Sequence, residues 1–514
     1  MFSFLYMEGL LCWLSPSTIQ RHCLYPDPNF SPSNLVSLVM TSDAQPTLPF
    51  ETRLSVVLSL LQAQMGAKVS TNASVCEAHS HGEAYQIAHM PAAVVFAQST
   101  ADVAAVLKVC HANHVPVVAF GAGTSVEGHV TPLEGGISLD LSRMTDVLAV
   151  NAADLDCRVQ AGITRQSLNA LLRDTGLFFP VDPGGEATIG GMCATRASGT
   201  AAVHYGTMKE NVLGLTAVMA NGEVIQTGGR VRKSSTGYDL TSLLVGSEGT
   251  LGIITEVQLR LHGLPEQISA AVCQFETLED AVNTAVEIIQ MGIPITRVEL
   301  LDAVQMQACI AFSNLTEFKP LTTLFFEFSG APEAVREQIS LTQSLATENN
   351  GLAFAWAETA DERNRLWKAR HNAFWAIKAQ NPGKQLVSTD CIVPISQLTE
   401  LINGVRQDIA ASGLYASILG HVGDGNFHTI IATEDTPEGY QQALALDRKI
   451  VARALSLHGS CSGEHGVGVG KLEFLETEHG PEALSVMRAL KATLDPRNIL
   501  NPGKLLPSGP IYHG

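Results

Sequence analysis

The sequence has 514 residues, of which 46% are hydrophobic and 16% charged, and its formal net charge is −18 at pH 7. This length predicts two or three packed units, and the acidic balance without any Lys/Arg cluster argues against nucleic acid or anionic membrane surfaces as partners. No apolar run approaches the roughly 18 residues of a membrane-spanning helix, and the ten cysteines include no Cys-x-x-Cys pair that would indicate a cluster or a disulfide framework.

Residues 1–46 resemble neither a signal peptide nor a folded domain, because the apolar start lacks basic residues. A mitochondrial presequence should be rich in arginine, whereas Arg21 is the only arginine before Arg53. We therefore expect a disordered extension, or a true start of translation at Met40. Together with the unpaired cysteines, this predicts a cytoplasmic protein, either free or peripheral to the inner membrane.

Regular structure becomes readable after this extension. Apolar residues at helical spacing between Glu51 and Gly66 predict an opening helix. The pattern that follows predicts a strand at 91–97, a helix at 100–113 and a second strand at 116–120.

A glycine-rich turn follows the second strand and reads Gly121-Ala122-Gly123-Thr124-Ser125, with Gly128-His129 close behind. Such a turn exposes several backbone N–H groups at once, which suits a pyrophosphate. The third glycine of an NAD-type Gly-x-Gly-x-x-Gly turn would stand at position 126, which is Val126, so that fold is disfavoured.

Further glycine clusters occur at a density that ordinary loops do not need. They are Pro183-Gly184-Gly185, Thr188-Ile189-Gly190-Gly191, Ser198-Gly199, Tyr205-Gly206 and Gly246-Ser247-Glu248-Gly249. This pattern indicates that backbone approaches a ligand closely. The alternative is a series of tight turns in a β-rich domain.

Three histidines and one glutamate stand in two glycine-rich segments that look like loops, 421–428 and 464–466. This donor set suits a borderline divalent ion such as Zn²⁺ or Mn²⁺. The histidines of the first segment would point to opposite faces of a straight strand, so a bend at Gly423 or Gly425 is needed to bring them together. The alternative is a hairpin with two satisfied histidines.

The motifs in the N-terminal half resemble the FAD-binding domain of the vanillyl-alcohol oxidase/p-cresol methylhydroxylase superfamily. The C-terminal motifs are similar to its D-lactate dehydrogenase branch, which also contains D-2-hydroxyglutarate dehydrogenases and the flavin-binding chains of glycolate oxidases. The motifs that carry the resemblance are 121–125, 188–199, 233–240, 246–254, 421–428, 462–468 and 501–504.

The resemblance implies an α+β protein with a two-part FAD-binding domain at 47–265. A cap domain that binds substrate and metal is expected at 266–480, and a C-terminal segment at 481–514 would return to the flavin. In the cap, predicted strands alternate with helical stretches, which indicates an antiparallel sheet covered by helices. The predicted cap strands are 268–275, 296–300, 323–328 and 352–356.

The resemblance also implies roles for individual residues. His421, His428 and Glu464 would hold a zinc or manganese ion, His465 would be the general base, and Arg370 would grip the substrate carboxylate. Read on its own, Arg370 lies mid-helix among apolar neighbours, where a buried guanidinium needs an anionic partner, although a surface salt bridge is the alternative. The residues expected to bind FAD are Gly121, Ala122, Gly123, Thr124, Ser125, Gly128, His129, Pro183, Thr188, Ile189, Gly190, Gly191, Ser198, Gly199, Gly249, Ile254 and Asn501.

The implied reaction oxidises D-lactate or a similar short D-2-hydroxy acid to the 2-oxo acid. The ion would lower the pKa of the substrate hydroxyl, His465 would remove its proton, and hydride would pass to flavin N5. The sequence has no haem or cluster motif, so an external acceptor, a cytochrome or a quinone, is expected. Relatives that act on 2-hydroxyglutarate carry Thr, Lys and Asn where this chain has Phe374, Ser388 and Ile430, and this difference favours a monocarboxylate.

Other functions stay open at this point. Within the family, the chain could be a D-2-hydroxyglutarate or glycolate dehydrogenase. A redox-neutral flavoprotein similar to the alkyl-dihydroxyacetone-phosphate synthases would keep the FAD domain, but that branch lacks the His/Glu set. A metal-dependent hydrolase would use the same His/Glu set around a water, but it would leave the glycine clusters unexplained. A homodimer is also compatible with the sequence.

Overall fold

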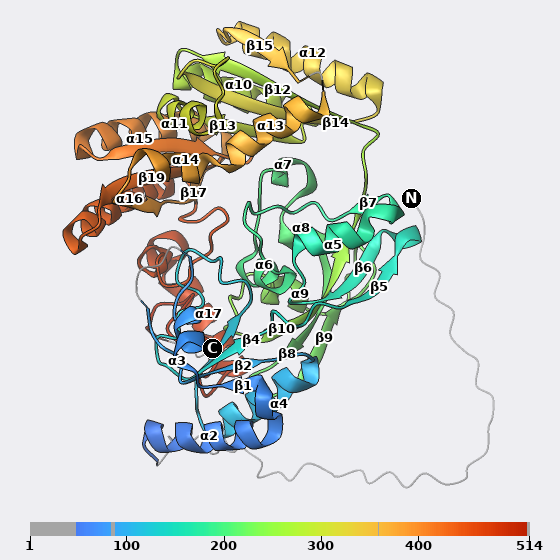
Figure 1. The fold of residues 1–514 in the computed structure, drawn as a ribbon, viewed down its shortest axis with the longest axis vertical. Helices are drawn as coiled ribbons and strands as arrows, with labels where there is room; N and C mark the ends of the chain where they lie inside the picture. Colours follow the sequence, from blue (N-terminus) through green and yellow to red (C-terminus); the bar gives the residue numbers. More distant parts are fainter. Residues whose placement is uncertain (1–47, 84–87, 358, 511–514) are drawn as a thin grey trace, which may run out of the picture. The chain divides into compact units, whose positions relative to one another are not determined.

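The computed structural model describes residues 48–83, 88–357 and 359–510, which belong to one compact unit. The extension expected to be disordered lies outside the described residues. Three principal sheets and one short strand pair organise the chain (Figure 1).

The first sheet has four strands in the order β1-β2-β4-β3, and it is parallel except for the β1/β2 pair. Helices α2 and α4 pack their apolar faces on it, with Val57 and Leu107 fully buried. The predicted helices and strands of this region are confirmed to within a few residues. The elements are α2 (Phe50–Met65), η1 (Gly66–Lys68), β1 (Val69–Ser70), α3 (Ala73–Ala78), β2 (Ala93–Phe96), α4 (Thr100–Ala112), β3 (Val117–Phe120) and β4 (Ile137–Asp140).

The second sheet has five antiparallel strands in the order β5-β6-β10-β8-β9, and a two-stranded pair, β7 with β11, lies outside it. Its strands are β5 (Val147–Asn151), β6 (Asp156–Gln160), β8 (Val212–Val218), β9 (Val224–Gly228) and β10 (Ile253–Arg260), and the pair is β7 (Leu177–Phe178) and β11 (His262–Gly263). The helical segments here are η2 (Ala152–Asp154), α5 (Arg165–Leu172), η3 (Arg173–Thr175), α6 (Ile189–Thr195), α7 (Ala202–Tyr205), α8 (Met208–Asn211) and α9 (Leu240–Leu244).

The third sheet is antiparallel, and seven of its eight strands run in the order β15-β12-β14-β13-β18-β19-β16, with β17 paired to β19. Alternate residues of each strand enter two separate cores: Phe326 packs with α10, α15 and α16, whereas its neighbour Phe325 packs with α11, α13 and α14. The expected antiparallel sheet covered by helices is therefore confirmed. The strands are β12 (Gln267–Phe275), β13 (Arg297–Leu301), β14 (Thr322–Gly330), β15 (Ala353–Trp356), β16 (Lys384–Ser388), β17 (Cys391–Ile392), β18 (Tyr415–Gly420) and β19 (Asn426–Glu434).

The helices of this part cover both faces of the third sheet (Figure 1). They are α10 (Leu278–Gln290), α11 (Ala303–Ser313), α12 (Pro332–Glu348), α13 (Ala360–His371), α14 (Ala373–Gln380), η4 (Ile395–Gln397), α15 (Leu398–Ser412) and α16 (Pro437–Ser456). After η5 (Leu472–Phe474) and α17 (Leu475–Leu494), the chain returns to the first sheet. There the N–H of Val117 in β3 donates to Ile499, and the N–H of Asn501 donates back to Val117.

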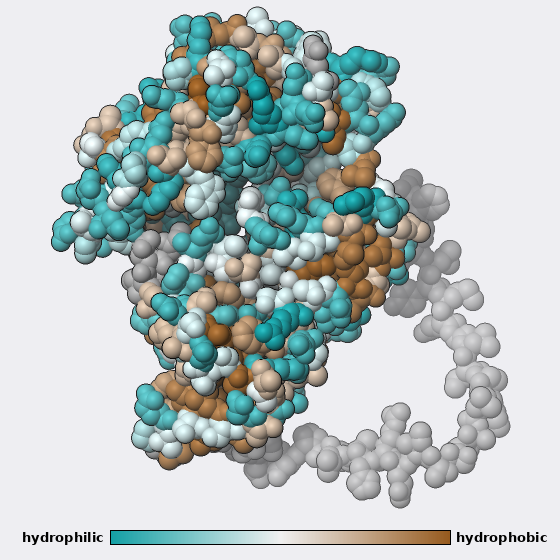
Figure 2. Space-filling view, in the orientation of Figure 1, coloured by the Kyte–Doolittle hydropathy of each residue, from teal (hydrophilic) through white to brown (hydrophobic). Residues whose placement is uncertain are grey.

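Polar side chains cover much of the face seen in Figure 2, and apolar ones gather over β5 and β6. Leu148 and Val150 on the edge strand β5 are 43% and 40% exposed. Throughout the described ranges, every helix is too short or too polar to cross a membrane.

Candidate active site

A cavity of about 790 Å³ is lined by residues from most of the sequence motifs, whereas segments 233–240 and 421–428 contribute none to its wall. Its wall includes the glycine-rich turn after β3, the segment leading into α6, and the turn before β10. From the third sheet and its helices come residues of α14 and β16, together with Glu464 and His465. This size is within the range of pockets that enclose a cofactor or a small ligand.

The glycine-rich turn has no room for side chains at its glycine positions. A Cβ added to Gly121 would lie 2.4 Å from Thr188 Oγ1, and Gly123 has φ +72°, a region that favours glycine. Ser125 Oγ beside them is buried and has no hydrogen-bond partner in the described part of the chain. A backbone cradle with an unpaired hydroxyl fits a polar group such as a pyrophosphate.

Most residues expected to bind FAD lie in the cavity wall. They are Gly121, Ala122, Gly123, Thr124, Ser125, His129, Pro183, Thr188, Gly190, Gly191, Ser198, Gly249, Ile254 and Asn501. Gly128, Ile189 and Gly199 are not in the wall. Ile189 belongs to the core of the second sheet, and a Cβ on Gly199 would lie 1.8 Å from the carbonyl oxygen of Asp182, so these residues shape the backbone behind the wall.

The expected bend between the two histidines is a β-hairpin. His421 directly follows β18 and His428 lies in β19, opposite Leu419. Gly425, with φ +81°, makes the turn, and a Cβ there would lie 2.2 Å from the carbonyl oxygen of Val393. The hairpin proposed as the alternative to a metal site is thus the structure that brings the imidazoles together, with ring centroids 5.4 Å apart.

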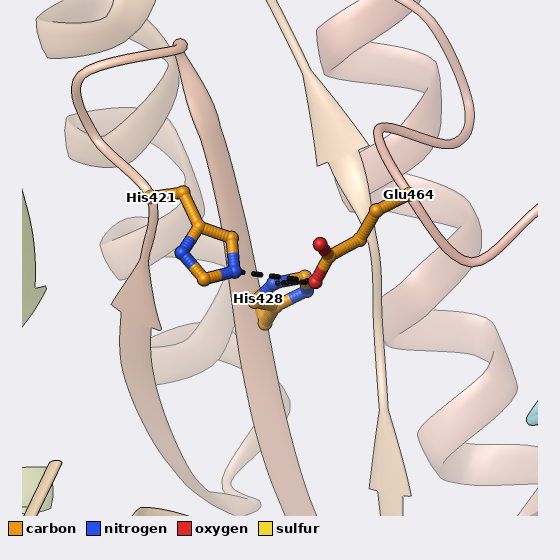
Figure 3. Close-up of side chains that lie close together, drawn as sticks. All are labelled: His421, His428 and Glu464. Carbon is orange, nitrogen blue, oxygen red and sulfur yellow. Dashed lines mark hydrogen bonds and ion pairs between the residues drawn. The ribbon is translucent and has the colours of Figure 1, made fainter. Parts of the chain in front are cut away.

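The two imidazoles converge on Glu464, as Figure 3 shows. His421 Nε2 and His428 Nε2 lie 3.2 and 3.1 Å from Glu464 Oε1, and the candidate ligand atoms are all within 4.8 Å of one another. Ligand atoms of a tetrahedral zinc ion with bonds of about 2.0–2.1 Å lie about 3.3 Å apart. Glu464 Oε2 is buried and finds no hydrogen-bond partner among residues 48–83, 88–357 and 359–510. The cluster therefore fits a divalent ion in size and in donor type.

The outer nitrogens of both imidazoles are held by other groups. His421 Nδ1 lies 2.7 Å from Glu299 Oε1, and His428 Nδ1 lies 3.1 Å from the carbonyl oxygen of Thr389. A neutral imidazole that donates from Nδ1 leaves the lone pair of Nε2 free, and here both Nε2 atoms face Glu464. The contacts at Nδ1 therefore favour the tautomer that a metal ligand requires once the imidazoles are neutral.

Negative charge surrounds the cluster. Burial lowers the pKa of His421, but Glu299 and Glu464 outweigh that effect and hold it well above its usual range. Burial also raises the pKa of Asp424 to about 7. A pocket with this many carboxylates is stabilised by a cation.

His465 lies in the cavity wall and stacks on His428, with ring centroids 5.1 Å apart. Its Nδ1 is 3.6 Å from Glu127 Oε1. Burial lowers the pKa of His465, but Asp390, Glu127 and Glu464 raise it to about 9. A divalent cation on the neighbouring cluster would oppose this shift, because it would repel a proton on the imidazole.

The loop that carries Glu464 and His465 is organised by Asp390, which the sequence motifs did not single out as a site residue. Asp390 is fully buried, and its Oδ2 accepts hydrogen bonds from Ser462 Oγ at 2.7 Å and from the N–H groups of Gly463, Glu464 and His465 at 2.8, 3.0 and 2.9 Å. Its Oδ1 accepts a further bond from the side chain of Asn426.

A second buried carboxylate, Glu248, joins this loop to the flavin-motif regions. Its oxygens accept the N–H groups of Val467 and Gly468 at 2.7 and 2.9 Å, and its carbonyl accepts from Asn501 Nδ2 at 2.7 Å. Glu248 stands in a motif that the sequence singled out, yet its contacts join segments more than 200 residues apart. Sequence spacing carries no signal for such partners.

Arg370 lies in α13 and has the anionic partner that its burial requires. Its Nε and Nη2 donate to Glu299 Oε2 at 3.0 and 2.6 Å, and this pair is buried rather than on the surface. Arg370 does not belong to the cavity wall. The structure therefore links Arg370 to the His421 cluster through one shared carboxylate.

The three residues whose identity favours a monocarboxylate do not all reach the cavity. Phe374 and Ser388 lie in the cavity wall, whereas Ile430 is packed in the core beneath α11 and α14. Two cations that the sequence argument did not consider, Lys378 and Lys384, also lie in the wall. Lys384 is 3.6 Å from Glu434, and Lys378 Nζ donates to the carbonyl of Lys384.

Two family models match this chain: an FAD binding domain over residues 91–228, and the C-terminal domain of FAD linked oxidases over residues 264–505. Among solved structures, p-cresol methylhydroxylase with bound substrate has a TM-score of 0.72 over 89% of this chain and 98% of that chain, at 15% identity. The fold and the matched domains define a flavoprotein of the vanillyl-alcohol oxidase/p-cresol methylhydroxylase type.

Curated relatives narrow this class. A protein named probable D-lactate dehydrogenase, mitochondrial, from Danio rerio is 47% identical over 85% of this chain and 89% of its own length. D-lactate dehydrogenase [cytochrome] 1, mitochondrial, from Saccharomyces cerevisiae is 40% identical over 84% of this chain and 76% of its own length. The chain belongs to the family of FAD-binding D-lactate dehydrogenases (cytochrome), glycolate oxidases and D-2-hydroxyglutarate dehydrogenases.

These comparisons correct one expectation from the sequence. The prediction of a cytoplasmic protein is wrong, because D-lactate dehydrogenases that are 40–47% identical to this chain are named mitochondrial. The prediction rests on the scarcity of arginine before Arg53 and on unpaired cysteines. A reduced mitochondrial compartment is equally compatible with unpaired cysteines, so that observation cannot separate the two locations.

Proposed function

We propose that this chain oxidises D-lactate, or a similarly short D-2-hydroxy monocarboxylate, to the 2-oxo acid with FAD and a divalent metal ion. One observation carries the proposal: a single cavity is lined both by the flavin motifs and by Glu464 and His465. A redox cofactor and a proton acceptor would thus face one substrate. The names of the relatives support D-lactate as the substrate, a cytochrome as the external electron acceptor, and a mitochondrial location.

The proposal assigns metal binding and proton transfer to different residues. His421, His428 and Glu464 would hold zinc or manganese, since their donor atoms lie within 4.8 Å of one another in a carboxylate-rich pocket. When bound, FAD accepts a hydride equivalent, and the ion polarises an oxygen as a Lewis acid. His465 would accept the hydroxyl proton, because it lies in the cavity wall beside the cluster, where a bound cation would counteract the carboxylates that hold its imidazole protonated.

Arg370 is the residue that we assign to the substrate carboxylate. Two nitrogens of the Arg370 guanidinium, Nε and Nη2, donate to Glu299, and Nη1 has no hydrogen-bond acceptor within the described ranges. Because the side chain stands behind the cavity wall, Nη1 would have to reach the substrate while Nε and Nη2 stay bound to Glu299. Two fixed attachment points, the ion and Arg370, would leave one α-hydrogen facing the flavin and select the D-enantiomer.

The side chains in the cavity wall favour a substrate whose end remote from the reacting carbon is short and uncharged. Phe374 offers apolar contact and Ser388 offers a hydroxyl where relatives that act on 2-hydroxyglutarate have a lysine. Among the related activities, D-2-hydroxyglutarate oxidation is the second candidate, and Lys378 and Lys384 in the wall are the observation that favours it.

An anaerobic titration tests the proposal. D-lactate is expected to bleach the flavin absorbance of the purified protein, and L-lactate is expected to leave it unchanged. A bound flavin that no short D-2-hydroxy acid bleaches would contradict the proposed activity.

A further inference from the structure

We infer that Glu299 is a positioning residue that fixes the orientation and tautomer of His421, and that it thereby sets the metal affinity of the cluster. This inference rests on the proposed function, because it takes His421 to be a metal ligand. It adds to that function a residue that is not itself a candidate metal ligand and that acts through the imidazole of His421.

The fold places Glu299 beside His421 through sheet register. Glu299 lies in β13, and the next residues, Leu300 and Leu301, pair with Gly420 and Leu419 of β18, immediately before His421. Strand alternation puts Val298 and Leu300 into one core and turns Glu299 toward the other face, which α13 covers. The carboxylate consequently stands between a helix that supplies Arg370 and a hairpin that supplies His421.

The two oxygens of Glu299 are divided between these partners. Oε2 accepts both bonds from Arg370, at 3.0 and 2.6 Å, and Oε1 lies 2.7 Å from His421 Nδ1. Glu299 is fully buried, so its charge is tolerable only because Arg370 compensates it. Arg370 thus fixes the carboxylate, and the carboxylate fixes the imidazole.

The two candidate histidine ligands differ in this respect. His428 donates to the backbone carbonyl of Thr389, an acceptor that no substitution removes, whereas His421 depends on a side chain. A charged acceptor at Nδ1 also makes Nε2 a stronger donor to a metal than a backbone carbonyl does. Glu299 is therefore a point at which the cluster can be weakened without replacing a candidate ligand.

Glu299→Gln should reverse the tautomer of His421. The amide has one acceptor oxygen, and the two donors of Arg370 claim it, so the amide NH₂ faces His421 Nδ1. Nδ1 must then accept, which places the imidazole proton on Nε2, where it blocks a metal. Loss of an outer-shell partner of this kind weakens metal binding by roughly 10–100-fold.

The test measures the Zn²⁺ affinity of the metal-stripped flavoprotein by competition with a chromophoric chelator. Glu327→Gln is the matched control, because Glu327 is a buried carboxylate of the neighbouring strand that pairs with Arg297. Glu299→Gln is expected to weaken Zn²⁺ binding roughly 10–100-fold, and Glu327→Gln is expected to leave it at the wild-type value. The flavin spectrum of each variant, recorded before titration, reports that the protein is folded.

Three outcomes decide the inference. Wild-type affinity in Glu299→Gln overturns it while leaving the proposed function intact. A wild-type protein that binds no Zn²⁺ yet is bleached by D-lactate overturns both the inference and the proposed metal, but not the flavin chemistry. Should Glu299→Gln lose its flavin, Glu299→Asp decides, since it keeps the charge and withdraws the acceptor by one methylene: weaker Zn²⁺ binding supports the role, and unchanged binding refutes it.

Discussion

Replacing Asp390 by asparagine should loosen the loop that carries Glu464 and His465. The Oδ2 atom of Asp390 accepts four hydrogen bonds from that loop, at 2.7 to 3.0 Å, and the side chain is fully buried. A hydrogen bond to a charged group contributes about 1.5–3 kcal/mol, against about 0.5–1.5 kcal/mol for a neutral pair. Asparagine keeps the shape but loses the charge, so each bond weakens by about 1–1.5 kcal/mol, and four independent bonds set an upper bound of about 4–6 kcal/mol of lost stability.

We expect Asp390→Asn to slow flavin reduction more than it weakens flavin binding, because Asp390 does not lie in the cavity wall. The substitution changes the carboxylate that holds the backbone of His465. A displacement of about 1 Å in a reacting group can lower the rate about 10²-fold. We expect Asp390→Asn to retain FAD, to unfold at lower urea concentration, and to reduce its flavin with D-lactate about 10²-fold more slowly. Urea titration and anaerobic stopped-flow absorbance measure the two effects.

Asp408→Asn provides the control. Asp408 pairs with Arg453 between α15 and α16 and is partly exposed, so its loss should change stability by less than about 1 kcal/mol and leave flavin reduction unchanged. If Asp390→Asn reduced its flavin at the wild-type rate, Asp390 would not be the anchor of the catalytic loop.

Three further results are expected. His428→Ala should keep FAD, because the flavin motifs lie in other segments, but should lose both Zn²⁺ binding and flavin reduction; turnover that survives chelation and this substitution would remove the metal from the mechanism. His465→Ala should keep Zn²⁺ and lose roughly 10²-fold or more in flavin reduction, whereas loss of the ion would make His465 a ligand. D-2-hydroxyglutarate should have a kcat/KM roughly 10³-fold below that of D-lactate, and equal values with a dye acceptor would show that Lys378 or Lys384 serves the second carboxylate.

Local patterns predict much of the fold. The opening helix, the first two long strands of the first sheet and four strands of the third sheet follow from apolar spacing and capping residues, and they appear close to their predicted places. The hairpin at 415–434 is not predicted as strands. Its glycines suggest loops, and β19 is buried on both faces, so it shows no alternation of polar and apolar residues.

The contacts around the candidate site could not be read from the sequence. Glu299 is 122 residues from His421, and the two meet only because β13 pairs with β18. Asp390 reaches its loop across more than 70 residues. The burial of Ile430 away from the cavity likewise depends on which face of β19 is covered by α11 and α14. Each of these facts is set by strand register, which motif spacing does not encode.

The central claim is that flavin, metal and base act on one substrate in one cavity. It is tested most directly by mixing the oxidised protein anaerobically with D-lactate, before and after removal of the metal by a chelator. We predict rapid bleaching of the flavin band, loss of bleaching in the stripped protein with the flavin still bound, and recovery on addition of Zn²⁺ or Mn²⁺. Bleaching that is equally fast without the metal would contradict the claim.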